Sequence, residues 1–111
     1  MLEEPESHMH PWAFTGLAEN LVDSAMSGLV SLVVTTHSGT LADLIVEESL
    51  RRRPGLAEVY YFSRRPGSNT SIYRVDTRRL YSEEAMTLAE LIHQPEGIID
   101  RLISEAILEE A

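Results

Sequence analysis

Hydrophobic residues recur at two different spacings along this chain, and the two spacings predict a mixture of helices and strands. Between residues 13 and 27 the apolar positions fall three or four apart, as on one face of a helix. These positions are Phe14, Leu17, Ala18, Leu21, Val22 and Ala25. Residues 29–36 form a nearly unbroken apolar run rich in β-branched side chains, which favours a strand covered on both faces.

A polar turn and a second helix follow this strand. Helical spacing resumes at Leu41, and Ser38 or Thr40 is the natural N-cap in front of it. Three arginines at 51–53 suit the negative end of the helix dipole, and the Pro-Gly pair at 54–55 ends the helix. The pattern therefore predicts a strand–turn–helix unit over residues 29–53.

The second half of the chain predicts a β-hairpin and two further helices. Residues 56–63 and 71–77 are rich in aromatic and β-branched side chains and flank a turn at 64–69. Helical spacing then runs from Ser82, taken as an N-cap, to His93, and again from about residue 96 to 109. We expect an α/β fold, with α+β possible, in the order α-β-α-β-β-α-α. We expect a small three-stranded mixed sheet covered by helices. Its first two strands, if adjacent, are parallel and joined by a right-handed crossover through the helix, and its second and third strands are antiparallel.

Length and composition favour one folded domain. The chain has 111 residues, 43% of them hydrophobic, so we expect a single domain at 13–111 after a flexible acidic tail at 1–12. It contains no cysteine, no signal-like start and no apolar run of membrane-spanning length, which favours a cytoplasmic protein without membrane contact. His8 and His10 on the tail are too few for a metal site, so we expect no metal and no cofactor.

Charge is distributed unevenly along this acidic protein, whose net charge is −9. Residues 51–79 hold eight arginines and two acids, for a net charge of +6, while the remaining sixteen acids accompany only Arg101. One interpretation is that these arginines pair with acidic helices, within the domain or across a subunit interface. The alternative is a basic face that binds phosphate or nucleic acid. The eight residues are Arg51, Arg52, Arg53, Arg64, Arg65, Arg74, Arg78 and Arg79.

The polar turn is the candidate ligand site. A loop that enters a helix N-terminus presents free backbone N–H groups and a partial positive charge to an anion. The residues concerned are Thr36, His37, Ser38, Gly39 and Thr40, although ordinary helix capping explains the same residues. His37 could act as a general base oriented by Asp43 or Glu47, but no second catalytic group has a diagnostic spacing, so an enzyme is the less favoured hypothesis.

The hairpin carries a second candidate chemistry. Arginines alternate there with aromatic residues, an arrangement that holds single-stranded nucleic acid by phosphate contact and base stacking. Tyrosines on a half-buried hairpin are more often core residues with a solvated hydroxyl. Because the whole chain is acidic and repels polyanions, we favour the core interpretation over nucleic-acid binding at this hairpin.

Two local resemblances involve the strand–turn–helix unit. VVTTHSGTLADLI resembles a segment in the C-terminal domain of pyruvate kinases through Ser38, Gly39, Ala42, Leu44 and Ile45, and implies an effector phosphate site at the turn. The second resemblance rests on the pairs Thr40-Leu41 and Asp43-Leu44 and on YSEEA at 81–85. These residues resemble the small assembly subunit of archaeal and eukaryotic RNA polymerases, which implies an assembly role. The two resemblances use the same residues, so at most one can hold.

We therefore expect a non-catalytic assembly or interaction subunit. Its C-terminal amphipathic helix and an open sheet edge would serve self-association or a protein partner, with a homo-oligomer as the default. The alternative is a small module that binds an anion or phosphometabolite at residues 36–40.

Overall fold

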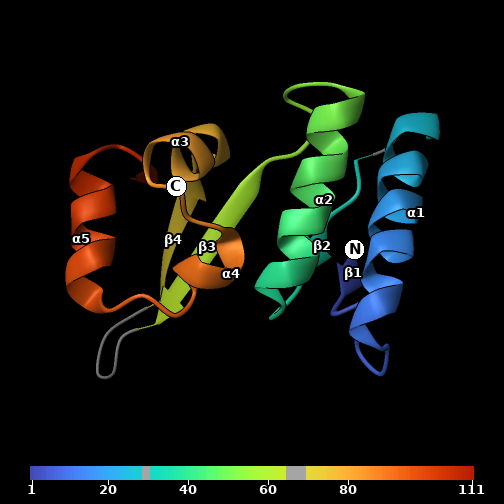
Figure 1. The fold of residues 1–111 in the computed structure, drawn as a ribbon, viewed down its shortest axis with the longest axis horizontal. Coiled ribbons are helices and arrows are strands. Elements are labelled where there is room, and N and C mark those ends of the chain that lie inside the picture. The colour runs from blue at the N-terminus through green and yellow to red at the C-terminus, as the bar shows by residue number, and fades with distance from the viewer. Residues whose placement is uncertain (29–30, 65–69) are drawn as a thin grey trace. The chain divides into compact units, whose positions relative to one another are not determined.

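The computed structural model describes residues 1–28, 31–64 and 70–111, with the side chain of residue 64 left aside. Within these ranges the chain forms a mixed α/β fold, as predicted, with five α-helices and five strands in two small sheets (Figure 1). Contacts between residues divide it into two compact units, residues 1–57 and residues 58–111, which we call unit 1 and unit 2. Each unit is described by itself.

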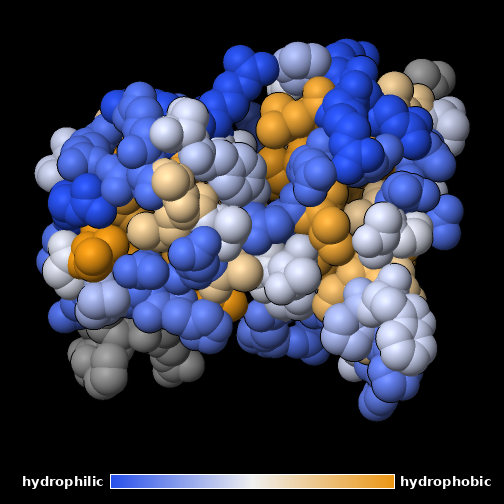
Figure 2. All heavy atoms as spheres, in the orientation of Figure 1, coloured by the Kyte–Doolittle hydropathy of each residue, from blue (hydrophilic) through white to orange (hydrophobic). Residues whose placement is uncertain are grey.

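Unit 1 is a pair of packed helices with a short parallel sheet. It contains β1 (Leu2–Glu3), the 3-10 turn η1 (Pro11–Ala13), α1 (Phe14–Ser27), β2 (Val34–Thr35) and α2 (Gly39–Arg52). Phe14 and Ala18 of α1 are buried with Leu41 of α2, so the predicted apolar stripe faces the second helix. Figure 2 shows hydrophobic side chains among hydrophilic ones over these two helices. β1 pairs in parallel with β2, Leu2 beside Val34 and Glu3 beside Thr35.

Unit 2 is a three-stranded antiparallel sheet with three helices. The elements are β3 (Val59–Arg64), β4 (Thr70–Val75), α3 (Thr77–Glu83), α4 (Leu88–Leu91), α5 (Glu96–Ser104) and β5 (Leu108–Glu110). The strand order is β3-β4-β5, and β4 is central. Buried residues come from the sheet and from all three helices: Tyr73, Val75, Leu80, Leu88, Leu91, Ile99, Leu102, Ile107 and Leu108.

The strands that form the two sheets differ from those of the single mixed sheet that the sequence predicted. The predicted strand at 29–36 is reduced to Val34–Thr35, which pairs with β1. Leu32 and Val33 are 37% and 55% exposed, so the expectation that both faces of this run are covered is wrong for them. Residues 29 and 30 lie outside the described residues. The third strand of the larger sheet comes instead from residues 108–110. The helical spacing had assigned the first two of these residues to the last helix.

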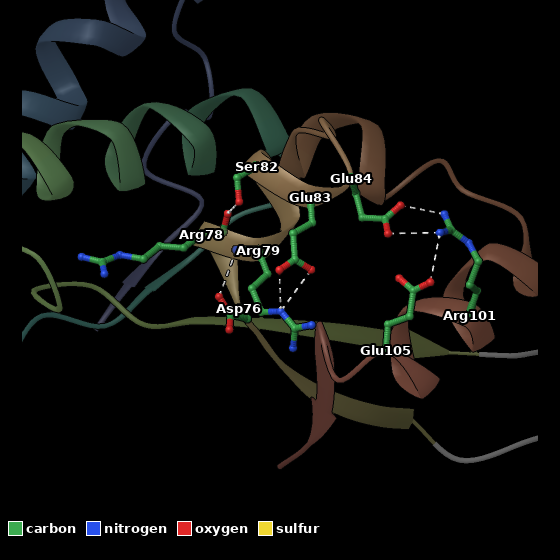
Figure 3. A network of polar contacts seen from close by, with 8 residues as sticks. All are labelled: Asp76, Arg78, Arg79, Ser82, Glu83, Glu84, Arg101 and Glu105. Carbon is green, nitrogen blue, oxygen red and sulfur yellow. Dashed lines mark hydrogen bonds and ion pairs between the residues drawn. The ribbon is translucent and has the colours of Figure 1, made fainter.

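The helices of unit 2 begin and end at residues other than those predicted. α3 starts at Thr77, because Asp76 accepts a hydrogen bond from the backbone N–H of Arg79 at 3.1 Å and caps the helix. Ser82, predicted as the cap, lies inside α3 and donates its hydroxyl to the carbonyl of Arg78 (Figure 3). α4 begins with a capping box in which Thr87 and Glu90 satisfy each other's backbone N–H groups.

The last helix, α5, ends at Ser104, five residues before its predicted end at 109, and is followed by a left-handed alanine. Ala106 has φ +61°, and its N–H bonds to the carbonyl of Ile103, while the N–H of Ile107 bonds to the carbonyl of Leu102. These two bonds form the Schellman motif that closes many helices, usually with glycine at the left-handed position. The reversal turns the chain into β5 and buries Ile107 and Leu108.

Candidate functional site

The turn at residues 36–40 is built by two side-chain hydroxyls. Ser38 is the N-cap of α2, and its Oγ accepts a hydrogen bond from the backbone N–H of Leu41 at 3.1 Å. Thr36 Oγ1 accepts a hydrogen bond from the backbone N–H of Ser38 at 2.9 Å. Gly39 is buried, whereas Thr40 and His37 are exposed. Capping, one of the two alternatives for these residues, is therefore present in the structure.

Two carboxylates of the N-terminal segment reach this turn. The hydroxyl of Thr36 donates a short hydrogen bond to Oε2 of Glu6, and Nε2 of His37 lies 3.0 Å from Oε1 of Glu4. The other carboxylate oxygen of Glu6 is buried and finds no hydrogen-bond partner among the described residues. The structure thus describes a contact of His37 with Glu4, and the side chain of His37 is 92% exposed. Its predicted role as a general base stays a prediction. The turn already holds a carboxylate, and that carboxylate belongs to the chain itself.

The segment that supplies these carboxylates was predicted as part of a flexible tail. Leu2 and Glu3 form β1, and the N–H of Glu4 bonds to the carbonyl of Thr35 at 2.7 Å, so the backbone of this segment runs beside β2. Its mobility and the single-domain organisation of residues 13–111 stay predictions. Further along, the rings of His10 and Trp12 stack with centroids 4.4 Å apart.

In unit 1 the arginines at the end of α2 pair with nearby acids. Arg52 contacts Asp23 of α1 at 2.7 Å and Glu48 at 3.0 Å, and its hydrogen bond to Glu48 raises its pKa. Arg51 contacts Glu47 at 2.9 Å and Glu48 at 3.2 Å. Glu48 is 8% exposed, so two guanidinium groups balance a buried carboxylate. Arg53 is exposed and forms the C-cap.

In unit 2 the remaining predicted basic residues are distributed over the sheet and α3. Arg74 lies 3.4 Å from Glu58, and Arg79 lies 3.2 Å from Glu83 (Figure 3). Arg78 is exposed, and in Figure 3 its side chain points away from the other labelled residues. Arg64 ends β3, and Arg65 lies outside the described residues. Among the arginines that the structure describes, Arg51, Arg52, Arg74 and Arg79 therefore form ion pairs with acids of their own unit. A binding role for the whole set stays a prediction.

The hairpin separates its aromatic residues onto two faces. Tyr73 is buried and Tyr61 is half-buried, and the two lie opposite each other in the register. On the other face Tyr60 is 47% exposed, Phe62 is 64% exposed and Ile72, opposite Phe62, is 40% exposed. The prediction that the tyrosines belong to the core holds for Tyr73 and fails for Tyr60. We call the exposed residues Tyr60, Phe62 and Ile72, with the unpaired side of β3, the β3 surface.

The two edges of this sheet differ in length and chemistry. β5 has three residues, and two of them are the exposed acids Glu109 and Glu110. β3 has six residues, VYYFSR, and among the described residues it pairs only with β4. Natural edge strands are protected by shortness, by charge or by proline. β5 has the first two protections, whereas β3 has neither along most of its length, and it contains no proline.

Other kinds of site find little support in the described part of the chain. No group of three or more His, Asp or Glu residues there could hold a metal ion, and no helix there is long and apolar enough to cross a membrane. No protein-family model, curated protein or solved structure matches this chain. The comparisons thus add nothing to the resemblances to pyruvate kinases and to the RNA polymerase subunit.

Proposed function

We propose that this protein is a non-catalytic interaction module that binds a protein partner by adding a strand at the β3 surface. The observation that carries the proposal is the contrast between the edges of one sheet. β5 is short and acidic, while the six-residue β3, within the described ranges, pairs with β4 along one edge only and carries two exposed aromatic side chains beside its other edge. An added strand would satisfy those backbone groups, and the exposed side chains would supply apolar contact.

The C-terminal helix does not contribute to this proposal. The sequence suggested that its apolar stripe serves an interface, but Ile99 and Leu102 of α5 are 5% and 0% exposed. Ile107, which the sequence placed on the same helix, is buried beyond its end. Three apolar side chains of the predicted stripe are therefore buried inside the folded chain, whereas Ile98 and Ile103 are half-buried. The proposal accordingly rests on the sheet edge.

Photo-crosslinking tests the proposal without assuming which partner binds. A benzoylphenylalanine placed at Phe62 is expected to form adducts of discrete mass, and the edge-protecting change Tyr60→Lys should abolish them. The matched control places the same group at Met26 of α1, another exposed apolar side chain (44% exposed). The proposal fails if positions 62 and 26 give the same adducts, or if Tyr60→Lys leaves the adducts at 62 unchanged.

The turn at 36–40 supports a second candidate function, the binding of a free carboxylate or phosphate. The favouring observation is that the hydroxyl of Thr36 already donates to a carboxylate, that of Glu6. An external anion would take the place of Glu6 in front of the capped helix. Replacement of Glu6 tests this candidate and is treated below.

A further inference from the structure

We propose that the partner at the β3 surface is a second copy of this chain, and that the two β3 strands pair antiparallel about a two-fold axis at Tyr61. This inference rests on the proposed function and adds the identity of the partner and the register. It follows from the order of residues along β3, from the chemistry of the two sheet edges and from the geometry of closed dimers.

The charges at the two ends of β3 are self-complementary. Glu58 precedes the strand and Arg64 ends it, three residues to either side of Tyr61. In an antiparallel pair centred on Tyr61, Glu58 of each copy therefore lies opposite Arg64 of the other copy. A parallel pair would place like charges side by side, which destabilises neighbouring strands. The order of charges in the sequence thus favours the antiparallel arrangement and this register, although Glu58 also contacts Arg74 and Tyr60 of its own chain.

The same register also matches the aromatic residues. Tyr60 of one copy falls opposite Phe62 of the other, and this pair occurs twice. Aromatic pairs across strands are among the favourable cross-strand contacts. Residues at even positions lie opposite even positions, so the exposed face of one hairpin continues into that of its partner. Exposed Tyr60, Phe62 and Ile72 from both copies then form one larger apolar face.

The other edge of the sheet cannot serve in the same way. Two copies of β5 would bring Glu109 and Glu110 against the same residues of a second chain. Pairing of β3 with β5 of another copy would leave one open edge at each end, and such head-to-tail contacts form filaments unless they close into a ring. The β3–β3 pair closes, because each copy uses its unprotected edge once. The resulting sheet has six strands, with the short acidic β5 strands at its outer edges.

The absence of cysteine from the chain makes the register directly measurable. A single Tyr61→Cys substitution is expected to give a disulfide-linked dimer under mild oxidation, because residue 61 lies opposite itself. The matched control is Ser63→Cys on the same side of β3. In the proposed register two residues at 63 are four positions apart, roughly 13 Å, which is beyond the reach of a disulfide. Circular dichroism of each variant verifies that the hairpin still folds.

Charge reversal supplies a second measurement that leaves the core side of the strand unchanged. Glu58→Arg and Arg64→Glu each place like charges opposite one another, and each should weaken dimerisation by about tenfold in sedimentation equilibrium. The double variant exchanges the charges and should return the dissociation constant to within about threefold of that of the unaltered chain. A restored affinity requires the two positions to lie opposite each other.

The outcomes separate the inference from the function on which it rests. A chain that sediments as a monomer at every concentration overturns the second copy as partner, and crosslinking through residue 63 but not residue 61 overturns the register. In the first case discrete adducts at residue 62 still support strand addition with a different partner, and in the second case a second copy remains the partner in another register. If benzoylphenylalanine at residue 62 of the otherwise unaltered chain forms no discrete adducts, the proposed function itself is rejected.

Discussion

Arg101 on α5 donates two hydrogen bonds to the carboxylate of Glu84, from Nη1 to Oε1 at 3.1 Å and from Nη2 to Oε2 at 2.8 Å (Figure 3). Glu84 is the C-cap of α3, seventeen residues earlier, and its side chain is only 13% exposed. A planar guanidinium fits a carboxylate in this paired geometry better than an ammonium group would. The contact joins the end of α3 to α5.

This pair makes the stability of unit 2 depend on pH. Hydrogen bonds from Arg101 lower the pKa of Glu84 below its ordinary value, so the ionised carboxylate stabilises the fold above about pH 4.3 and the effect disappears as the pH falls through the lowered pKa. We expect Glu84→Gln to lower the urea midpoint at pH 7 and to match the unaltered chain in strong acid. Glu110→Gln, at an exposed acid of β5, is the control for the loss of one negative charge. Equal midpoints at pH 7 would contradict the assignment.

Ala106→Gly should stabilise the protein. An L-residue in the left-handed region is strained, and glycine removes that strain at the position that closes α5. We expect a gain of about 0.5–1 kcal/mol in the free energy of unfolding, measured by urea denaturation. Ala42→Gly, inside α2, should instead lose about 1 kcal/mol. A loss at both positions would show that residue 106 is not left-handed in solution.

Ser38→Ala should cost about 1 kcal/mol of stability, because it removes the acceptor for the N–H of Leu41 at the start of α2. Ser38→Asp preserves a capping oxygen and should retain most of the stability. Thermal unfolding of the three proteins measures the difference. An aspartate variant as unstable as the alanine variant would argue that the hydroxyl has a role other than capping.

Glu6→Ala should open the turn to external anions. Removal of this carboxylate frees the hydroxyl of Thr36, so millimolar phosphate or acetate is expected to raise the melting temperature of the variant more than that of the unaltered chain. Glu3→Ala changes the same net charge on β1 and is the control. If phosphate and acetate affect both variants equally, the turn is a helix cap and the binding hypothesis for residues 36–40 fails.

Local signals in the sequence predicted those parts of the fold that depend on neighbours along the chain. The apolar stripe of α1 and Ser38 at the start of α2 appear as expected, and so does the hairpin. The end of α5 was missed because alanine is a good helix former and nothing in the sequence marks Ala106 as left-handed. Asp76, in contrast, is a typical N-cap residue and caps α3, but residues 71–77 were predicted as a strand, so this cap was missed.

The candidate sites depend more on distant contacts, which spacing cannot reveal. Glu6 accepts a hydrogen bond from Thr36, thirty positions later in the sequence. The segment around Glu6 has no hydrophobic periodicity from which this contact could be predicted. Tyr60 and Phe62 lie two positions apart in β3 and therefore share one face of the sheet. Which face is covered depends on β5 and the helices, and β5 itself was predicted as helix.

The position of β5 also has a consequence for how the protein is made. β5 pairs with the central strand β4 but is synthesised last among the elements of unit 2. The β3–β4 hairpin therefore leaves the ribosome with both edges unpaired and with Phe62 and Ile72 exposed. α1 and α2 of unit 1, in contrast, can pack before β5 exists. During translation the nascent hairpin therefore presents unpaired strand edges and exposed apolar side chains, which favour aggregation until β5 is made.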